Sequence, residues 1–264
     1  EMLPCLLAIP ALVAPAAPQE SPKVQAALVA EHETLAPGKT AWIGIRMEIE
    51  PGWHTYWKGR NTTGTPPIIR WKLPQGYKVG EVLWPGPKRY IAYGDSLDHV
   101  HEGKVLLMAP LEVPADAQPG TRIELEAECM FVVCQDICLM EKSRHTLSLK
   151  VGESDPKPGP AAKLFEQTRK ALPVPLEKAE GVKARVEKSS LVIEAPDAQR
   201  ISFFPAEDSA ETPEVLTEGE VQGGILRVTL EPTPEARRVK GVAEVVPKGS
   251  REGVFVSIDL EIPE

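Results

Sequence analysis

Two closely spaced cysteines, Cys134 and Cys138, are the residues of this chain with the clearest capacity for chemistry. Four fully extended steps span roughly 13 Å, whereas the Cα atoms of a disulfide lie about 4.4–6.8 Å apart. The pair can therefore bond only where the chain turns, across Gln135-Asp136-Ile137. A small ring at a turn is easier to reach and to reduce than a bridge between distant strands. The spacing thus indicates thiol–disulfide exchange, with a structural staple as an alternative.

The segment before the pair alternates like a half-buried β-strand. Its odd-numbered positions from 123 to 133 are apolar and include Cys129, whereas the even-numbered ones carry three glutamates and end at Cys134. Successive side chains of a strand point to opposite faces, so Cys129 is predicted in the core and Cys134 on the wetter face. In a simple hairpin Cys134 faces Cys138 and Cys129 faces Ser143, which favours a Cys134–Cys138 bond.

Neighbouring charges leave the reactivity of this pair open. Exchange requires a reachable thiolate, which Lys142 and Arg144 would favour. Asp136 and Glu141 would oppose it. A staple is less persuasive because so small a ring removes on the order of 2 kcal/mol or less of unfolded-state entropy.

A metal site is the third reading of the cysteines. It would combine Cys129, Cys134, Cys138 and His145, but their spacing matches no familiar zinc pattern. Cys129 and Cys134 also point to opposite sides of one strand. Cu(I), which thiolates suit, stays open as a rival. Our prediction is that the site uses no metal and no cofactor.

The elements that must position the pair are predicted to be strands. Short β-rich runs separated by Pro, Gly and Asp indicate an antiparallel sandwich before residue 152. A Pro-rich linker and one helix from Ala161 to Leu172 follow, and Pro173 ends the helix. The later strands contain no cysteine or histidine, so no chemistry is expected there. The predicted division is a signal-like remnant at 1–21, a sandwich at 22–152, the linker and helix at 153–175, and a smaller sandwich at 176–264.

The composition and the N-terminal residues limit the classes of partner and the cellular location that can be expected. The net charge of −8 and the scattered Lys and Arg argue against a nucleic-acid partner. Residues 2–18 resemble the apolar and cleavage parts of a secretory signal, or else form a disordered remnant. Cleavage near residues 16–19 would remove Cys5 and leave three cysteines. We therefore predict a periplasmic or otherwise exported protein in which disulfides persist, with no membrane span in the mature chain.

Aromatic and histidine residues lie upstream of the cysteines. Four of the five tryptophans fall within residues 53–84 and are predicted to pack in the core and turns. His54 is predicted to be packed and hydrogen-bonded. His99 and His101 are predicted to be solvated in a polar loop.

Several motifs in order carry a family resemblance. They are Gly52-Trp53-His54-Thr55-Tyr56-Trp57, Leu73-Pro74-Gln75-Gly76, Trp84-Pro85-Gly86-Pro87, Tyr93-Gly94, and Val133 with the Cys134–Cys138 hairpin. Over about residues 22–150 this order resembles the periplasmic N-terminal region of DsbD/ScsB-type thiol:disulfide interchange proteins. Weaker similarity at 202–205 and 239–242 resembles the second β-domain of ScsB-like members.

The resemblance implies an immunoglobulin-like fold, and hence an all-β chain of two such antiparallel sandwiches. It implies that Cys134 and Cys138 form a redox dithiol, with Cys138 attacking the partner disulfide. The dithiol would take electrons from a membrane thiol–disulfide donor and pass them to oxidised periplasmic proteins, with cytochrome complex assembly among the processes served. It further implies a cap loop carrying Tyr90 and Tyr93, of which Tyr93 is the expected shield.

Three departures from the family pattern accompany this resemblance. Leu139-Met140 follows the second cysteine where Ile/Val-Pro is common, the loop at 95–101 is longer than expected, and the sequence ends after the second β-region. A fragment of a protein-disulfide reductase system and a stand-alone protein both fit. The rivals are a copper-handling module and a non-catalytic docking module with a structural disulfide.

Overall fold

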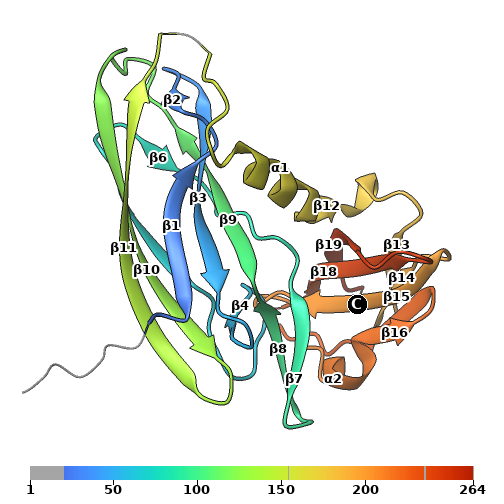
Figure 1. Ribbon diagram of the computed structural model, residues 1–264. Coiled ribbons are helices and arrows are strands. Elements are labelled where there is room, and N and C mark those ends of the chain that lie inside the picture. The colour runs from blue at the N-terminus through green and yellow to red at the C-terminus, as the bar shows by residue number, and fades with distance from the viewer. Residues whose placement is uncertain (1–20, 154, 235, 264) are drawn as a thin grey trace, which may run out of the picture.

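The computed structural model describes residues 21–153, 155–234 and 236–263, so the signal-like segment lies almost wholly outside it. Within those residues the chain is all-β and immunoglobulin-like, built from antiparallel sheets with only short helices (Figure 1). The predicted fold class is confirmed. Two groups of sheets, here called the N-terminal and the C-terminal sandwich, have separate hydrophobic cores.

The N-terminal sandwich has two sheets, ordered β1-β3-β9-β6 and β2-β11-β10-β4-β8-β7, with β5 also pairing with β10. Its strands are β1 (Val24–Ala30), β2 (Thr34–Leu35), β3 (Thr40–Ile49), β4 (His54–Tyr56), β5 (Ile68–Lys72), β6 (Lys78–Val79), β7 (Lys88–Ala92), β8 (Ser96–His101), β9 (Lys104–Glu112), β10 (Arg122–Cys134) and β11 (Cys138–Val151).

Alternating apolar side chains form the core of this sandwich. Ile43, Ile45 and Met47 of β3 are fully buried and share one cluster with Leu125 and Phe131 of β10. Because the period of a strand is two, the same alternation that buries these residues orients every side chain of β10. The long β10–β11 hairpin is therefore held in one register.

That register agrees with the prediction for the cysteines. Cys134 pairs with Cys138 and Cys129 pairs with Ser143. Cys129 is 3% exposed and carries a free thiol, which confirms its predicted place in the core.

The C-terminal sandwich has sheets ordered β12-β19-β18-β15-β16 and β13-β14-β17. Its elements are β12 (Val174–Pro175), the 3-10 helix η1 (Leu176–Lys178), β13 (Lys183–Glu187), β14 (Ser190–Glu194), β15 (Ala198–Pro205), α2 (Val215–Glu218), β16 (Glu220–Gln222), β17 (Ile225–Thr229), β18 (Arg238–Pro247) and β19 (Val254–Glu261).

The helix predicted after the linker is present as α1 (Ala162–Ala171). Its buried Phe165 packs with Leu106 and Met108 of β9, so α1 covers the N-terminal sandwich on the side that leads to the C-terminal one (Figure 1). The residue boundaries of the two domains stay a prediction. No helix in the described part of the chain is long and apolar enough to cross a membrane.

Side chains also join the two sandwiches directly. Trp57 packs with Phe204 and Val242 in one buried cluster. Arg60 forms an ion pair with Glu211 at 2.7 Å between Nη1 and Oε2. The chain segment that follows β4 therefore contacts β15 and β18 through apolar side chains, and an ion pair to Glu211 adds a second link.

Candidate functional site

Cys134 and Cys138 form a disulfide at the end of the β10–β11 hairpin. Their Cα atoms lie 4.1 Å apart, and Gln135-Asp136-Ile137 makes the turn. The backbone N–H of Gln135 donates to the carbonyl of Ile137 at 3.0 Å, which closes the turn. The bond predicted from the spacing is thus present.

The two sulfurs of this bond lie in unlike surroundings. Cys138 is exposed, whereas Cys134 is only 3% exposed and clusters with Tyr56 and Val100. The expectation that Cys134 occupies a wetter, accessible face is wrong. Alternation along β10 identifies a face of the sheet, but β4 and β8 supply side chains that cover this face.

Tyr56 is the side chain in closest polar contact with the disulfide. Its hydroxyl donates to Cys134 Sγ at 2.9 Å and lies 3.9 Å from Cys138 Sγ. Burial raises the pKa of the Tyr56 hydroxyl, so the phenol keeps its proton where thiols exchange. The sequence prediction did not assign Tyr56 a role; the available signal was its place in the Gly-Trp-His-x-Tyr-Trp motif.

A loop after β4 folds back over the Tyr56 ring. Asn61 anchors it, because its amide group donates to the Trp57 carbonyl and accepts from the His99 backbone N–H. Gly64 lies against the ring so closely that a Cβ there would come within 2.1 Å of ring carbons. The absence of a side chain at Gly64 therefore permits the loop to cover Tyr56.

His54 and Tyr90 complete the cover on the buried side of the disulfide. Their ring centroids lie 4.3 Å apart, and His54 stands opposite Cys134 in the β4–β10 pairing. Burial lowers the pKa of His54, against an opposing effect of Asp98. His54 is therefore a neutral, packed ring at neutral pH.

Of the two tyrosines predicted to cap the pair, the structure brings only Tyr90 to the Cys134 cluster. Tyr93 is 88% exposed and adopts a φ of 54° at the β7–β8 turn. A side chain so exposed covers little, so the choice of Tyr93 as the main shield is not supported by its position. The role of either tyrosine as a cap stays a prediction.

His99 and His101 are not solvated, contrary to expectation. They lie on β8 and are 1% and 4% exposed, respectively. His99 packs between Trp57 and Phe204, and His101 stacks on Trp84. Gly94 and Asp95 lie in the turn after β7, and residues 96–101 form β8. β8 pairs with β7 on one side and, through Val100 and His101, with β4 on the other.

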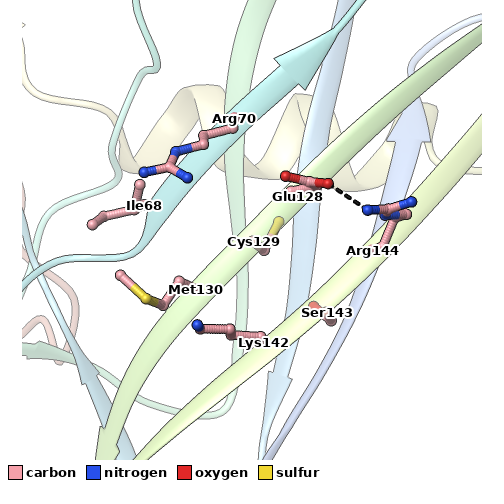
Figure 2. A pocket seen from close by; sticks show the side chains of 8 residues that line it. All are labelled: Ile68, Arg70, Glu128, Cys129, Met130, Lys142, Ser143 and Arg144. Carbon is pink, nitrogen blue, oxygen red and sulfur yellow. Dashed lines mark hydrogen bonds and ion pairs between the residues drawn. The ribbon is translucent and has the colours of Figure 1, made fainter.

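Cys129 lies at a separate groove on β5, β10 and β11. The groove, of about 520 Å³, is lined by Ile68, Arg70, Glu128, Cys129, Met130, Lys142, Ser143 and Arg144 (Figure 2). Burial raises the pKa of the Cys129 thiol to about 12. A thiol with so high a pKa is a poor nucleophile at neutral pH, so Cys129 contributes packing.

The metal reading gains no support from the geometry. Among the described residues no group of three or more His, Cys, Asp or Glu side chains is arranged to hold an ion. Cys129 faces the core while Cys134 is bonded to Cys138.

Exposed apolar side chains flank Cys138 in the chain and also occur on a hairpin at the same end of the sandwich. Ile137 and Met140, on either side of Cys138, are 63% and 65% exposed. Ile91 and Tyr93 are exposed on the β7–β8 hairpin, whose turn lies at the same end of the N-terminal sandwich as the β10–β11 turn (Figure 1). Apolar groups exposed beside a reactive atom are typical of a surface that contacts another protein.

Comparison with known proteins agrees with this geometry. Residues 25–150 match the family model described as thiol:disulfide interchange protein DsbD, N-terminal. The crystal structure of the N-terminal periplasmic domain of ScsB from Proteus mirabilis is similar with a TM-score of 0.57. That alignment covers 92% of this chain and 95% of the other at 15% identity, and therefore shows a shared fold.

Other solved structures are more distant. The periplasmic chaperone SfaE gives a TM-score of 0.27 at 11% identity, covering 88% of this chain and 98% of that one. The major pilin SpaD from Corynebacterium diphtheriae gives 0.32 at 10% identity, covering 88% and 59%. Neither similarity is strong enough to bear on function. A comparison with curated proteins finds no match.

Proposed function

Residues 25–150 form a DsbD/ScsB-type N-terminal domain of the thiol–disulfide interchange class, and from this premise we propose that the chain shuttles reducing equivalents through Cys134 and Cys138. The donor would be a membrane protein with an exchanging dithiol. The acceptors would be oxidised exported proteins in the periplasm.

The observation that carries this proposal is the inequality of the two sulfurs. Thiol–disulfide exchange requires one sulfur that a partner can reach and a second that resolves the mixed disulfide. Cys138 is exposed at a turn and Cys134 is buried behind it, bonded to it. A staple would need no such difference in access.

The proposed exchange uses these positions. In the reduced protein the Cys138 thiolate attacks a partner disulfide and forms a mixed disulfide, and one partner sulfur leaves as a thiolate. Cys134 then attacks Cys138 Sγ, which restores the internal disulfide and releases the second partner sulfur. Re-reduction reverses this order, because a donor thiolate reaches Cys138 first. The two sulfurs carry all the electrons exchanged.

The reduction potential of the pair tests this function. We would equilibrate the protein in dithiothreitol redox buffers, trap free thiols, and map them by mass spectrometry. A pair that serves exchange is expected to have a potential above about −300 mV. Because Cys5 and Cys129 add thiols to the chain, the measurement uses a Cys5→Ser, Cys129→Ser background.

The parent chain with both of those cysteines is the matched control and is expected to give the same potential. A Cys134–Cys138 bond that stays oxidised well below about −300 mV would exclude the shuttle and leave a structural disulfide.

A further inference from the structure

A buried carboxylate lies behind the disulfide, and the exchange steps above do not use it. Asp98 of β8 is 1% exposed. Its Oδ1 accepts the backbone N–H groups of Thr62 and Thr63 at 2.8 and 2.9 Å, and its Oδ2 accepts the Thr63 hydroxyl at 2.6 Å. Three donors therefore converge on this carboxylate and compensate for its removal from water.

Hydrogen bonds connect this carboxylate to the site. The Thr63 Oγ1 that donates to Asp98 lies 3.1 Å from the Tyr56 hydroxyl, which in turn lies 2.9 Å from Cys134 Sγ. Thr63 has one hydroxyl proton, and it is used on Asp98. Thr63 is therefore left as an acceptor towards Tyr56. In the disulfide form the single Tyr56 proton is donated to Cys134 Sγ. In the reduced protein Cys134 carries a proton of its own, so the row of hydrogen bonds Cys134–Tyr56–Thr63–Asp98 can be directed from the sulfur to the carboxylate.

We propose that Asp98 is a positioning residue that takes up the proton of Cys134 through Tyr56 and Thr63 when Cys134 resolves a mixed disulfide. The inference rests on the proposed function and deepens it. In the reduced protein the Cys134 thiol donates to Tyr56, Tyr56 donates to Thr63, and Thr63 donates to Asp98. This arrangement holds Cys134 as a neutral thiol until it attacks.

The resolving step balances as follows. A bond forms between Cys134 Sγ and Cys138 Sγ, and the bond between Cys138 and the partner sulfur breaks. The electron pair of the broken bond leaves with the partner sulfur as a thiolate. The Cys134 proton moves to Tyr56 as the Tyr56 proton moves to Thr63 and the Thr63 proton to Asp98. The carboxyl group then returns its proton to the departing thiolate or to water.

The other titratable groups near this row of hydrogen bonds do not serve as the final proton acceptor. The charge of Asp98 acts to raise the pKa of His54 of β4, but burial has the larger effect, lowers that pKa and keeps the ring neutral. Tyr90 of β7 lies near Tyr56. The charge of Glu102, just after β8, acts to raise the pKa of His54. Burial raises the pKa of Tyr56, so Tyr56 passes a proton as a hydroxyl and does not act as a base. Asp98 is the anion that the row reaches.

The variant Thr63→Val separates the relay from the carboxylate. It removes the hydroxyl while leaving the two backbone donors of Asp98 in place. In the Cys5→Ser, Cys129→Ser background, reduced protein is mixed with 5,5′-dithiobis(2-nitrobenzoic acid). Attack by Cys138 releases a first thionitrobenzoate, and resolution by Cys134 releases a second. The second phase therefore reports the step assigned to Asp98.

We expect Thr63→Val to slow the second phase about tenfold or more at neutral pH, as loss of a general base does. Its rate should then rise about tenfold per pH unit, because hydroxide must remove the proton, whereas the parent shows a flatter profile. The first phase should be unchanged. Thr63→Ser keeps the hydroxyl and Asp95→Asn removes an exposed carboxylate of the same hairpin, and both should match the parent.

Asp98→Asn should slow the second phase in the same way; if it does not fold, Thr63→Val decides alone. A second phase in Thr63→Val with the parent's rate and pH profile would overturn the relay. If Thr63→Val behaves like the parent and the reduction potential of the pair is above about −300 mV, only the proton relay is excluded. If the Cys134–Cys138 bond resists reduction, the proposed function is excluded, whatever the rates of the second phase.

Discussion

At the scale of single residues, the two sulfurs of one disulfide differ in solvent exposure. Cys138 lies in solvent between the exposed Ile137 and Met140. Cys134, four positions away, lies under Tyr56 and Val100. Under the proposed exchange, this difference in access is enough to set the order of attack, because a thiolate that cannot be reached cannot exchange.

Single-cysteine variants test that order. In the Cys5→Ser, Cys129→Ser background, Cys134→Ser is expected to form a stable one-to-one adduct with 5,5′-dithiobis(2-nitrobenzoic acid), since Cys138 stays exposed and has no resolving partner. Cys138→Ser leaves only the buried Cys134 and should react at least several-fold more slowly. Stopped-flow absorbance of thionitrobenzoate measures both rates, and equal rates would contradict the assignment.

At the scale of elements, the β7–β8 hairpin and β4 together cover Cys134. β8 pairs with β4, which pairs with the end of β10 at Cys134. The hairpin therefore places Tyr90 against His54 and leaves Tyr93 at its tip. Three positions along the hairpin thus separate a side chain in the packed body, Tyr90, from one at the solvent-exposed turn, Tyr93.

Access to the disulfide should depend on Tyr90 more than on Tyr93. Tyr90→Ala is expected to speed reduction by dithiothreitol several-fold, because it uncovers the Cys134 side of the bond. Tyr93→Ala is expected to leave the rate unchanged, and thiol trapping over time measures both. Faster reduction in Tyr93→Ala with an unchanged rate in Tyr90→Ala would restore the sequence-based choice of Tyr93 as the cap.

At the scale of the whole molecule, the buried His99 lies where the two sandwiches meet, and His101 is buried two positions further along β8. Both ring nitrogens of His99 lack a hydrogen-bond partner among the described residues, and the ring contacts Phe204 of the C-terminal sandwich. Burial lowers the pKa of His99, and that of His101, to about 4. Each ring is thus neutral in the folded protein and resists protonation.

These histidines should make the protein less stable in mild acid. The unfolded chain binds protons below about pH 6.5 while the folded rings stay neutral down to about pH 4, so the stabilisation present above pH 6.5 is lost as the pH falls. From pH 7 to pH 5 the free energy of unfolding should drop by on the order of 2 kcal/mol for each histidine. Urea unfolding at both pH values measures this drop.

His99→Phe, which keeps an aromatic ring between Trp57 and Phe204, is the matched variant. It should remove about half of this pH dependence, since His101 remains. An unchanged dependence would show that His99 is not neutral in the folded protein or not the titrating group.

Local pattern was enough to determine much of the site. The alternation along 123–134 predicted that Cys129 faces the core, and the three-residue turn predicted Cys134 opposite Cys138. Both follow from the two-residue period of a strand and from hairpin register, which depend only on neighbours in the chain. The order of short motifs further identified the type of domain over residues 25–150.

Only the tertiary structure decided what surrounds the pair. Tyr56 is 78 residues before Cys134 in the chain, and Thr63 and Asp98 are 35 residues apart. Periodicity shows which face of a strand a residue occupies but not which distant strand covers that face. The burial of Cys134, the exposure of Tyr93 and the row from Asp98 to the sulfur therefore depend on how β4, β8 and β10 pair, which no local pattern specifies.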